Sequence, residues 1–373
     1  MEKIKVLSVF GTRPEAVKMA PLVKELEKRK EFDSIVCVTA QHREMLDQVL
    51  EIFSIKPDYD LNIMVEKQSL SRITCRALEG IGEIIQKEKP HIVLVHGDTT
   101  TTFVASLAAF YNKTKVGHVE AGLRTFNKYF PFPEEMNRKL AGSIADLHFA
   151  PTNLTKENLL RENVREDSVF VTGNTVIDAM NYTVKKSYKF KTEELNSIDF
   201  ENKKVIMVTA HRRENWGEGI ENICTSLKKI VNENEDVEIV YLVHLNPIVK
   251  EDVEKHLSGI KRVHLLNPLD TEETHNLMNK CYMIMTDSGG IQEEAPHLGK
   301  PVLVLRHVTE RQEALQAGTV KLVGTDINII VFEANKLLRD KKAYEHMSNL
   351  SNPYGNGKTS IEICNILKAY FSN

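Results

Sequence analysis

The sequence predicts an α/β protein made of two Rossmann-like domains. Short apolar runs recur along the chain, and each is followed by a turn and a segment with helical spacing, a pattern typical of parallel sheets. This alternation begins again after a polar stretch at residues 185–203. The chain has 373 residues, which fits about two domains of roughly 150 residues each.

The first half begins with a predicted strand at residues 4–10, and a helix follows it. Thr12 and Glu15 have the spacing of a capping box, and Pro14 stands in the first helical turn, where its missing N–H does no harm. Further strands are expected at residues 34–39, 92–96, 116–119, 147–150 and 169–171, and further helices at residues 43–53, 73–87 and 101–111.

The second half repeats the pattern, so that the predicted domains are residues 1–172 and 173–358. Its strands are expected at residues 204–209, 237–243, 262–265, 283–286 and 301–305, with helices between them.

The composition excludes several classes of protein. Lys and Arg total 49 and Asp and Glu total 52, so the formal net charge of −3 argues against binding nucleic acid by bulk charge. The five cysteines are scattered without a CxxC pair, which disfavours disulfides and a cysteine zinc site. No apolar stretch approaches the 18 residues of a membrane helix, and the run at residues 6–10 is too short for a signal peptide. We therefore expect a cytoplasmic protein with no membrane partner.

Polar residues follow the predicted strands in seven places. In parallel sheets, ligands bind beyond the carboxyl ends of the strands. One such segment alone is more often a turn or a helix cap, but seven together predict a charged cleft. The segments are residues 11–13 (GTR), 41–43 (QHR), 97–99 (GDT), 120–122 (EAG), 211–213 (HRR), His244 and residues 287–290 (DSGG).

Residues 287–294 (DSGGIQEE) have the composition of a phosphate-binding turn. Ser288, Gly289 and Gly290 would let backbone N–H groups approach an anion at a helix start, although an ordinary strand-to-helix turn fits equally well. Glu294, one turn into that helix, suits a pair of ribose hydroxyls. No GxGxxG segment follows the first strand, which disfavours a dinucleotide cofactor.

Three carboxylates and one histidine are candidates for acid–base chemistry. Asp98 and Glu120 each follow a predicted strand, and Glu134 begins a helix, where it could equally serve only to complement the helix dipole. His211 follows a strand and could equally be a buried structural histidine. The histidines form no HxH, HxxxH or HExxH pattern, so a metal site has little support.

Seven longer segments of the chain can be compared as a set. They are residues 11–16 (GTRPEA), 41–46 (QHREML), 95–100 (VHGDTT), 117–125 (GHVEAGLRT), 131–135 (PFPEE), 211–215 (HRREN) and 287–296 (DSGGIQEEAP). Together they resemble the non-hydrolysing UDP-N-acetylglucosamine 2-epimerases, and the resemblance runs in the family's order from about residue 4 to residue 358.

This resemblance implies two Rossmann-like domains in the GT-B arrangement, with the active site in the interdomain cleft and a last helix, residues 359–373, packing back on the first domain. It also implies interconversion of UDP-N-acetylglucosamine (UDP-GlcNAc) and UDP-N-acetylmannosamine (UDP-ManNAc) through 2-acetamidoglucal, without metal or redox cofactor, in a homodimer. The product would serve a bacterial surface polysaccharide. UDP would be held by Arg13, Lys18, Ser288, Gly289, Gly290, Glu294 and Arg311, and the chemistry would be served by Asp98, Glu120, Glu134 and His211.

The resemblance further implies activation by UDP-GlcNAc at a second site. The matching positions are Gln41, His42, Glu44, Lys67, Glu134, Arg212 and His244. Glu44 and Lys67 depart from the Gln and Arg of some regulated relatives, and a carboxylate there would repel a diphosphate, so weaker activation is expected.

Other departures lie near the expected nucleotide site. Gln312 stands where proline is usual, and His307 stands where Asp or Asn is common. Thr271 and Thr274 replace aromatic residues, which weakens packing on the uracil.

Three other functions remain open on the sequence alone. A hydrolysing relative would release free N-acetylmannosamine, and a GT-B glycosyltransferase would share the fold but need an acceptor groove. A catalytically inactive sensor would not need all of Asp98, Glu120, Glu134 and His211.

Overall fold

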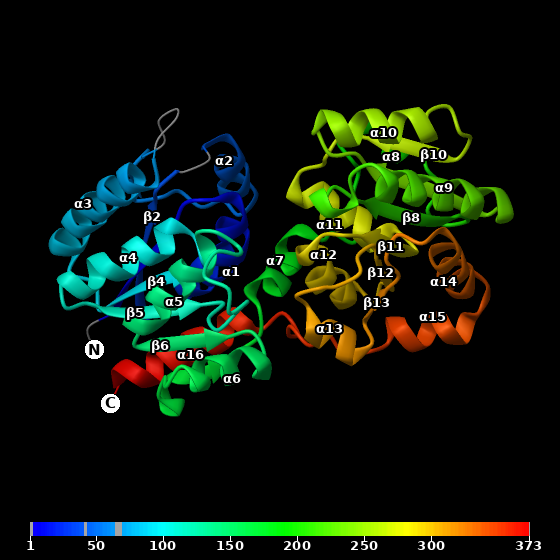
Figure 1. The fold of residues 1–373 in the computed structure, drawn as a ribbon. Coiled ribbons are helices and arrows are strands. Elements are labelled where there is room, and N and C mark those ends of the chain that lie inside the picture. Colours follow the sequence, from blue (N-terminus) through cyan, green and yellow to red (C-terminus); the bar gives the residue numbers. More distant parts are fainter. Residues whose placement is uncertain (1–2, 41–42, 64–68, 373) are drawn as a thin grey trace. The chain divides into compact units, whose positions relative to one another are not determined.

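The computed structural model describes residues 3–40, 43–63 and 69–372, and within residues 43–45 only the backbone. The chain forms two compact units. Unit 1 comprises Met1–Tyr182 and Tyr354–Asn373, and unit 2 comprises Thr183–Pro353. Each unit contains one sheet with helices packed against it (Figure 1).

The sheet of unit 1 has seven parallel strands in the order β3-β2-β1-β4-β5-β6-β7. The predicted strands are confirmed, with ends shifted by up to two residues, and the two-residue strand β3 was not predicted. The strands are β1 Ile4–Phe10, β2 Phe32–Val38, β3 Tyr59–Asp60, β4 Ile92–His96, β5 Lys115–Val119, β6 Leu147–Ala150 and β7 Val169–Val171.

The helices of unit 1 bury apolar faces against this sheet. Ile81 and Ile85 of α3 and Val104 of α4 join Leu7 and Val95 of the strands in one core cluster. The last helix, α16, red in Figure 1, contacts α1 within the same unit. The helices are α1 Arg13–Lys28, α2 Arg43–Ile52, α3 Leu70–Glu88, α4 Thr100–Tyr111, α5 Glu134–Ile144, α6 Asn153–Arg161, α7 Thr175–Thr183 and α16 Thr359–Ser372, with a 3₁₀ turn at Glu166–Ser168.

The sheet of unit 2 has six parallel strands in the order β10-β9-β8-β11-β12-β13. The short strand β13 was not predicted, and the other five were. The strands are β8 Lys204–Thr209, β9 Val237–Leu242, β10 Val263–Leu266, β11 Met283–Thr286, β12 Val302–Val304 and β13 Val320–Leu322. Two parallel α/β units therefore confirm the predicted fold class.

The helices of unit 2 enclose its own core, in which Ile223 and Leu227 of α9 meet Tyr241 of β9 and Leu303 of β12. They are α8 Glu193–Asn196, α9 Glu218–Glu233, α10 Pro247–Leu257, α11 Thr271–Lys280, α12 Gly289–Glu294, α13 Gln312–Ala317, α14 Ile327–Arg339 and α15 Lys341–Ser348, with 3₁₀ turns at Arg213–Asn215 and Ala295–Leu298.

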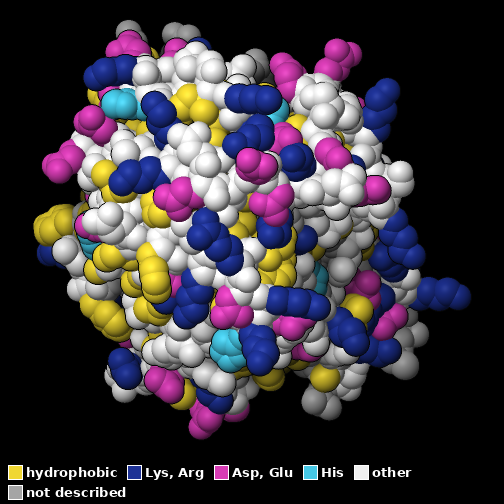
Figure 2. All heavy atoms as spheres, turned by 90° about the vertical axis from the view of Figure 1, so that its right-hand side faces the viewer, with side chains coloured by type: hydrophobic (Ala, Val, Ile, Leu, Met, Phe, Trp, Pro, Cys, Tyr) yellow, Lys and Arg dark blue, Asp and Glu magenta, His cyan; other side chains and the backbone are white. Residues whose placement is uncertain are grey.

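Basic and acidic side chains lie interspersed on the face seen in Figure 2, in keeping with the small net charge. In the part of the chain that the structure describes, no helix is both long enough and apolar enough to cross a membrane.

Candidate active site

The strand orders show where each unit is built to hold a ligand. In unit 1 the order changes direction between β1 and β4, and in unit 2 between β8 and β11. Ligands bind beyond the carboxyl ends of the strands at such switch points. Arg13 and Asp98 follow β1 and β4, and His211 and Ser288 follow β8 and β11, so four predicted site residues lie at these two points.

Glu120 is the most constrained carboxylate of unit 1. Its φ of 60° lies in the left-handed region, which is costly for a residue other than glycine and is often kept at functional sites. Its Oε2 pairs with the Lys18 ammonium and accepts a hydrogen bond of 2.7 Å from Nδ2 of Asn174. These two contacts hold the Glu120 carboxylate in one orientation.

His96 lies beside this carboxylate, with its Nε2 atom 3.8 Å from Oε2 of Glu120. Burial lowers the pKa of His96 to about 4, and the favourable charge of Glu120 does not outweigh that effect. His96 is therefore neutral at neutral pH, and Lys18 is the cation that faces Glu120.

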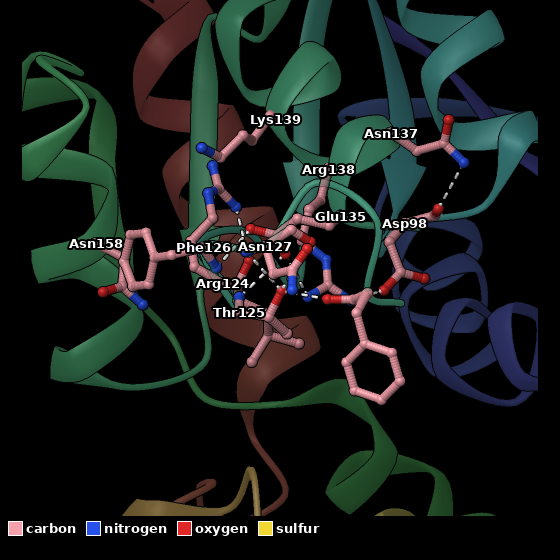
Figure 3. A network of polar contacts seen from close by, with 12 residues as sticks. Asp98, Arg124, Thr125, Phe126, Asn127, Glu135, Asn137, Arg138, Lys139 and Asn158 are labelled. Carbon is pink, nitrogen blue, oxygen red and sulfur yellow. Dashed lines mark hydrogen bonds and ion pairs between the residues drawn. The ribbon is translucent and has the colours of Figure 1, made fainter. Parts of the chain in front are cut away.

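Asp98 belongs to a second network, drawn in Figure 3. Arg138 pairs with Oδ2 of Asp98 and also lies 3.2 Å from Oε2 of the fully buried Glu135. Glu135 in turn accepts hydrogen bonds from the backbone N–H groups of Thr125 and Phe126. The loop after β5, the start of α5 and Asp98 are thus tied together through one guanidinium group.

Glu134 is the first residue of α5, one turn before Arg138, and is partly exposed. Arg13 is the exposed first residue of α1. The predicted capping box before it is confirmed: Oε2 of Glu15 accepts from the N–H of Thr12 at 2.8 Å, and Thr12 caps the helix. A further bond of 2.7 Å from Thr99 fixes the turn that presents Arg13.

In unit 2, His211 lies over a buried carboxylate. The Nδ1 atom of His211 is 3.3 Å from Oδ1 of Asp287, and its ring stacks on that of His244 with centroids 5.1 Å apart. Burial lowers the pKa of His211, and Asp287 opposes this while His244 and Arg212 add to it. The balance of these charges sets how readily the ring carries a proton.

The turn from Ser288 to Gly290 leads into α12, as predicted. Ser288 occupies the N-cap position without a side-chain hydrogen bond to the helix. A Cβ atom on Gly289 would lie 3.4 Å from Nη2 of Arg311, so the glycine makes room for that guanidinium group. Arg311 is also paired with the buried Glu293. A helix start with a cation beside it suits a phosphate group.

The Glu294 carboxylate is contacted by His275 of α11. Its Oε2 atom is 3.5 Å from Nε2 of His275, and Nδ1 of His275 is 2.6 Å from the hydroxyl of Thr183. A carboxylate oriented in this way has the geometry to accept hydrogen bonds from a ribose.

Three residues that depart from the family pattern, Gln312, Thr274 and His307, make local contacts. Nε2 of Gln312 donates to the carbonyl of Thr309 at 2.5 Å, and the hydroxyl of Thr274 donates to the carbonyl of Asp270 at 2.7 Å. The ring of His307 packs against Gly324, which has a φ of 61°. A Cβ atom added to Gly324 would lie only 3.0 Å from that ring.

Of the positions expected to form the activating site, Gln41, His42 and Lys67 lie outside the described residues. Glu44 is in α2, and only its backbone is described. Arg212 and His244 lie beside His211 in unit 2.

The sequence analysis did not assign Arg138, Asn174 or His275 to the site, and it included Glu135 and Asp287 only as members of longer segments, without a role as partners of the predicted residues. Glu135 lies within the segment at residues 131–135, and Arg138 lies three residues after it. Asn174 follows β7, and the rule of polar residues after a strand could have found it.

Each unit is a parallel sheet with polar side chains at its switch point, which is typical of α/β proteins that bind a ligand at that place. The model of the UDP-N-acetylglucosamine 2-epimerase family matches residues 24–368. The chain is 69% identical over 371 residues to a protein of Clostridium acetobutylicum, covering 100% of this chain and 96% of that protein. It is 59% identical to the UDP-N-acetylglucosamine 2-epimerase of Bacillus subtilis, covering 97% and 94%.

Among solved structures, the UDP-GlcNAc 2-epimerase of Neisseria meningitidis bound to UDP-GlcNAc matches with a TM-score of 0.86 and 52% identity, covering 98% of this chain and 100% of that one. This chain belongs to the UDP-N-acetylglucosamine 2-epimerase family.

Proposed function

We propose that the protein interconverts UDP-GlcNAc and UDP-ManNAc without hydrolysis. UDP is eliminated to leave 2-acetamidoglucal and is then added back after proton transfer on the other face of C2. The observation that carries the proposal is that the chain has both kinds of group that the reaction needs. Asp98 and Glu120 of unit 1 are carboxylates held by cations, and unit 2 has a helix start flanked by Arg311. The relative from N. meningitidis, solved with UDP-GlcNAc, supports the choice of substrate.

The order of bond breaking follows from the chemistry of the sugar. No carbonyl group is attached to C2, so its proton is poorly acidic in the intact nucleotide sugar. Departure of UDP builds positive charge at C1 and makes the C2 proton far easier to remove. A site for this reaction therefore needs an anion receiver for the diphosphate and positioned carboxylates for the proton.

We assign the diphosphate to Arg13, Lys18, His211, Arg311 and the turn from Ser288 to Gly290. Glu294 would accept the ribose hydroxyls. Asp98, Glu120 and Glu134 would then serve proton transfer. Lys18 pairs with Glu120 and Arg138 pairs with Asp98, and these ion pairs fix the direction of the two carboxylates.

The test is to incubate the protein with UDP-ManNAc in D₂O and follow the products by NMR. We expect UDP-GlcNAc with deuterium at C2 and, on prolonged incubation, small amounts of UDP and 2-acetamidoglucal. Free N-acetylmannosamine would instead indicate the hydrolysing reaction, and an unchanged substrate would indicate a sensor or a glycosyltransferase. Product without solvent deuterium would exclude the elimination route.

Variants at the carboxylates test the assignment of residues. Asp98→Asn and Glu120→Gln should each lower turnover about 10²-fold or more, the usual contribution of a positioned acid or base, while UDP binding persists. Asp33→Asn, at an exposed aspartate of β2, is the matched control and should leave turnover unchanged. An Asp98→Asn enzyme with near-normal turnover would remove Asp98 from the chemistry.

We also propose that UDP-GlcNAc activates the enzyme at a second site formed by Gln41, His42, Glu44, Lys67, Glu134, Arg212 and His244. Initial rates from pure UDP-ManNAc should rise when a trace of UDP-GlcNAc is added, by less than in relatives with a neutral residue in place of Glu44. A rate that does not respond would contradict this proposal.

Finally, we propose a cytoplasmic homodimer that supplies N-acetylmannosamine units for a surface polysaccharide. Phe110 and Tyr111, at the end of α4, are 62% and 64% exposed, which is typical of residues buried by a partner subunit. Sedimentation should show a dimer, and Phe110→Glu should shift it toward monomer.

A further inference from the structure

Asp287 is the most deeply buried carboxylate of unit 2, with no exposed surface. Its Oδ2 atom accepts three hydrogen bonds: from the backbone N–H groups of His211 and Arg212, each at 2.8 Å, and from Nδ2 of Asn215 at 3.0 Å. Because all three donors belong to one short segment, Asp287 anchors the loop that follows β8.

The second oxygen of Asp287 has a different environment. In the described part of the chain Oδ1 accepts no hydrogen bond, although it is buried. The nitrogen of His211 that approaches it is Nδ1, at 3.3 Å. Buried carboxylate oxygens are almost always hydrogen-bonded, and a small rotation of the imidazole ring brings an Nδ1–H group into line.

We propose that Asp287 is a positioning residue that accepts a hydrogen bond from Nδ1–H of His211, so that the protonated ring has its Nε2–H free to donate to the departing diphosphate of the nucleotide sugar. Asp287 does not itself touch the substrate in this proposal. The proposal deepens the function proposed above and rests on it only for the role of His211 in turnover.

The groups around His211 explain why such a partner is needed. Burial disfavours the charged ring, and His244 and Arg212 disfavour it further, so all three lower the pKa of His211. Asp287 is the one group among these that raises it. Asp287 therefore favours the protonated ring, which alone can face Asp287 with Nδ1–H and also donate to the diphosphate from Nε2–H, and without the carboxylate this form is rarer.

An amide in place of the carboxylate makes a sharp test. In Asp287→Asn the amide oxygen must accept the three donors of the loop, so the amide NH₂ is turned toward Nδ1 of His211. Nδ1 must then act as acceptor, and the proton moves to Nε2. The substitution therefore inverts the tautomer with little change of shape.

The first measurement uses the unaltered protein. Nitrogen-15 NMR of the histidine rings above the pKa of His211, with His211→Gln used to assign its signals, should show the Nδ1–H tautomer. The Nε2–H tautomer would overturn the proposal. This readout requires neither activity nor a folded Asp287 variant, so it stands even if the proposed epimerisation fails.

The second measurement compares Asp287→Asn with Asn215→Ala, which loosens the same loop but leaves Oδ1 in place. Asp287→Asn should invert the tautomer, lower the pKa of His211 and reduce kcat about 10²-fold or more, with a smaller change in KM. Asn215→Ala should keep the tautomer and the pH midpoint of His211. Equal pH midpoints in the two variants would show that Asp287 only anchors the loop and would overturn the proposal.

Discussion

The two units hold their ionisable groups in different ways. In unit 1, Glu120 and Asp98 are paired with the cations Lys18 and Arg138, and Asp98 keeps 29% of its side chain exposed. In unit 2, Asp287 is fully buried and is held mainly by backbone N–H groups. A carboxylate that exchanges protons needs access and an adjustable charge, whereas one that fixes geometry needs rigid donors. This difference agrees with the roles proposed above, which are proton transfer for Asp98 and Glu120 and positioning for Asp287.

The two units also differ in their buried histidines, and this difference predicts the largest effect, a loss of stability of unit 1 in acid. Burial lowers the pKa of His96, His118 and His148 in unit 1 to about 4, about 3 and about 4. In the unfolded chain these rings titrate near 6.5, so between about pH 6.5 and 4 the unfolded state binds protons that the folded state does not. Unit 1 should therefore lose stability as the pH falls through this range, at about 1.4 kcal/mol per pKa unit for each ring.

The Glu310 carboxylate of unit 2 responds at lower pH than these histidines. Burial raises the pKa of Glu310, but hydrogen bonding and charge from Arg306 outweigh it and lower the pKa to about 2. Its contribution is present above pH 4.5 and is lost as the pH falls toward 2. In unit 1, burial raises the pKa of Glu15 and Asp178, which offsets part of the loss from the histidines.

We therefore expect acid to unfold unit 1 before unit 2. Hydrogen exchange followed by mass spectrometry at stepwise lower pH should show unit 1 opening first. Trp216, the only tryptophan of the chain, reports on unit 2, and its fluorescence should change at lower pH than the exchange of unit 1. A change of Trp216 fluorescence ahead of the exchange would contradict the order.

The next largest effect is a difference in unfolding free energy between variants of two arginines, each of which bridges two carboxylates. Arg138 joins Asp98 to Glu135, whose side chain is 0% exposed, whereas Arg306 joins Glu214 and Glu310, which are 46% and 43% exposed. Arg138→Met leaves a buried carboxylate without its cation and should cost about 3 kcal/mol of unfolding free energy. Arg306→Met leaves carboxylates that water can reach and should cost about 1 kcal/mol or less for the ion pairs.

Denaturant unfolding of the two variants measures this difference. Arg138→Met should also lower turnover, because Asp98 loses the group that orients it, and Arg306→Met is the matched control for removing a bridging arginine. Equal losses of stability would mean that burial of Glu135 does not distinguish the two networks.

Much of this organisation could be predicted from the sequence, because local patterns determine it. Continuous apolar runs predicted the strands, and the spacing of Thr12 and Glu15 predicted the start of α1. Strand β3 has only two residues, and the three residues of β13 include the exposed Lys321, so neither forms a continuous apolar run. Family resemblance supplied the proposed roles of Asp98 and Glu120, but their partners Arg138 and Asn174 are 40 and 54 residues away and meet them only through the fold.

The smallest expected effect concerns two helix starts. Thr12 caps α1 through its side chain, and Glu15 returns the bond, whereas Ser288 begins α12 with no side-chain cap. Thr12→Ala should therefore cost about 1 kcal/mol of unfolding free energy, and Ser288→Ala should change stability by less than about 0.5 kcal/mol. If the Ser288 hydroxyl is kept for a phosphate, Ser288→Ala should instead weaken UDP binding about tenfold, as expected for a lost hydrogen bond to a charged group. Thermal unfolding and UDP titration calorimetry on both variants separate the two roles. A Ser288→Ala protein that loses stability but keeps its UDP affinity would make Ser288 a structural cap like Thr12.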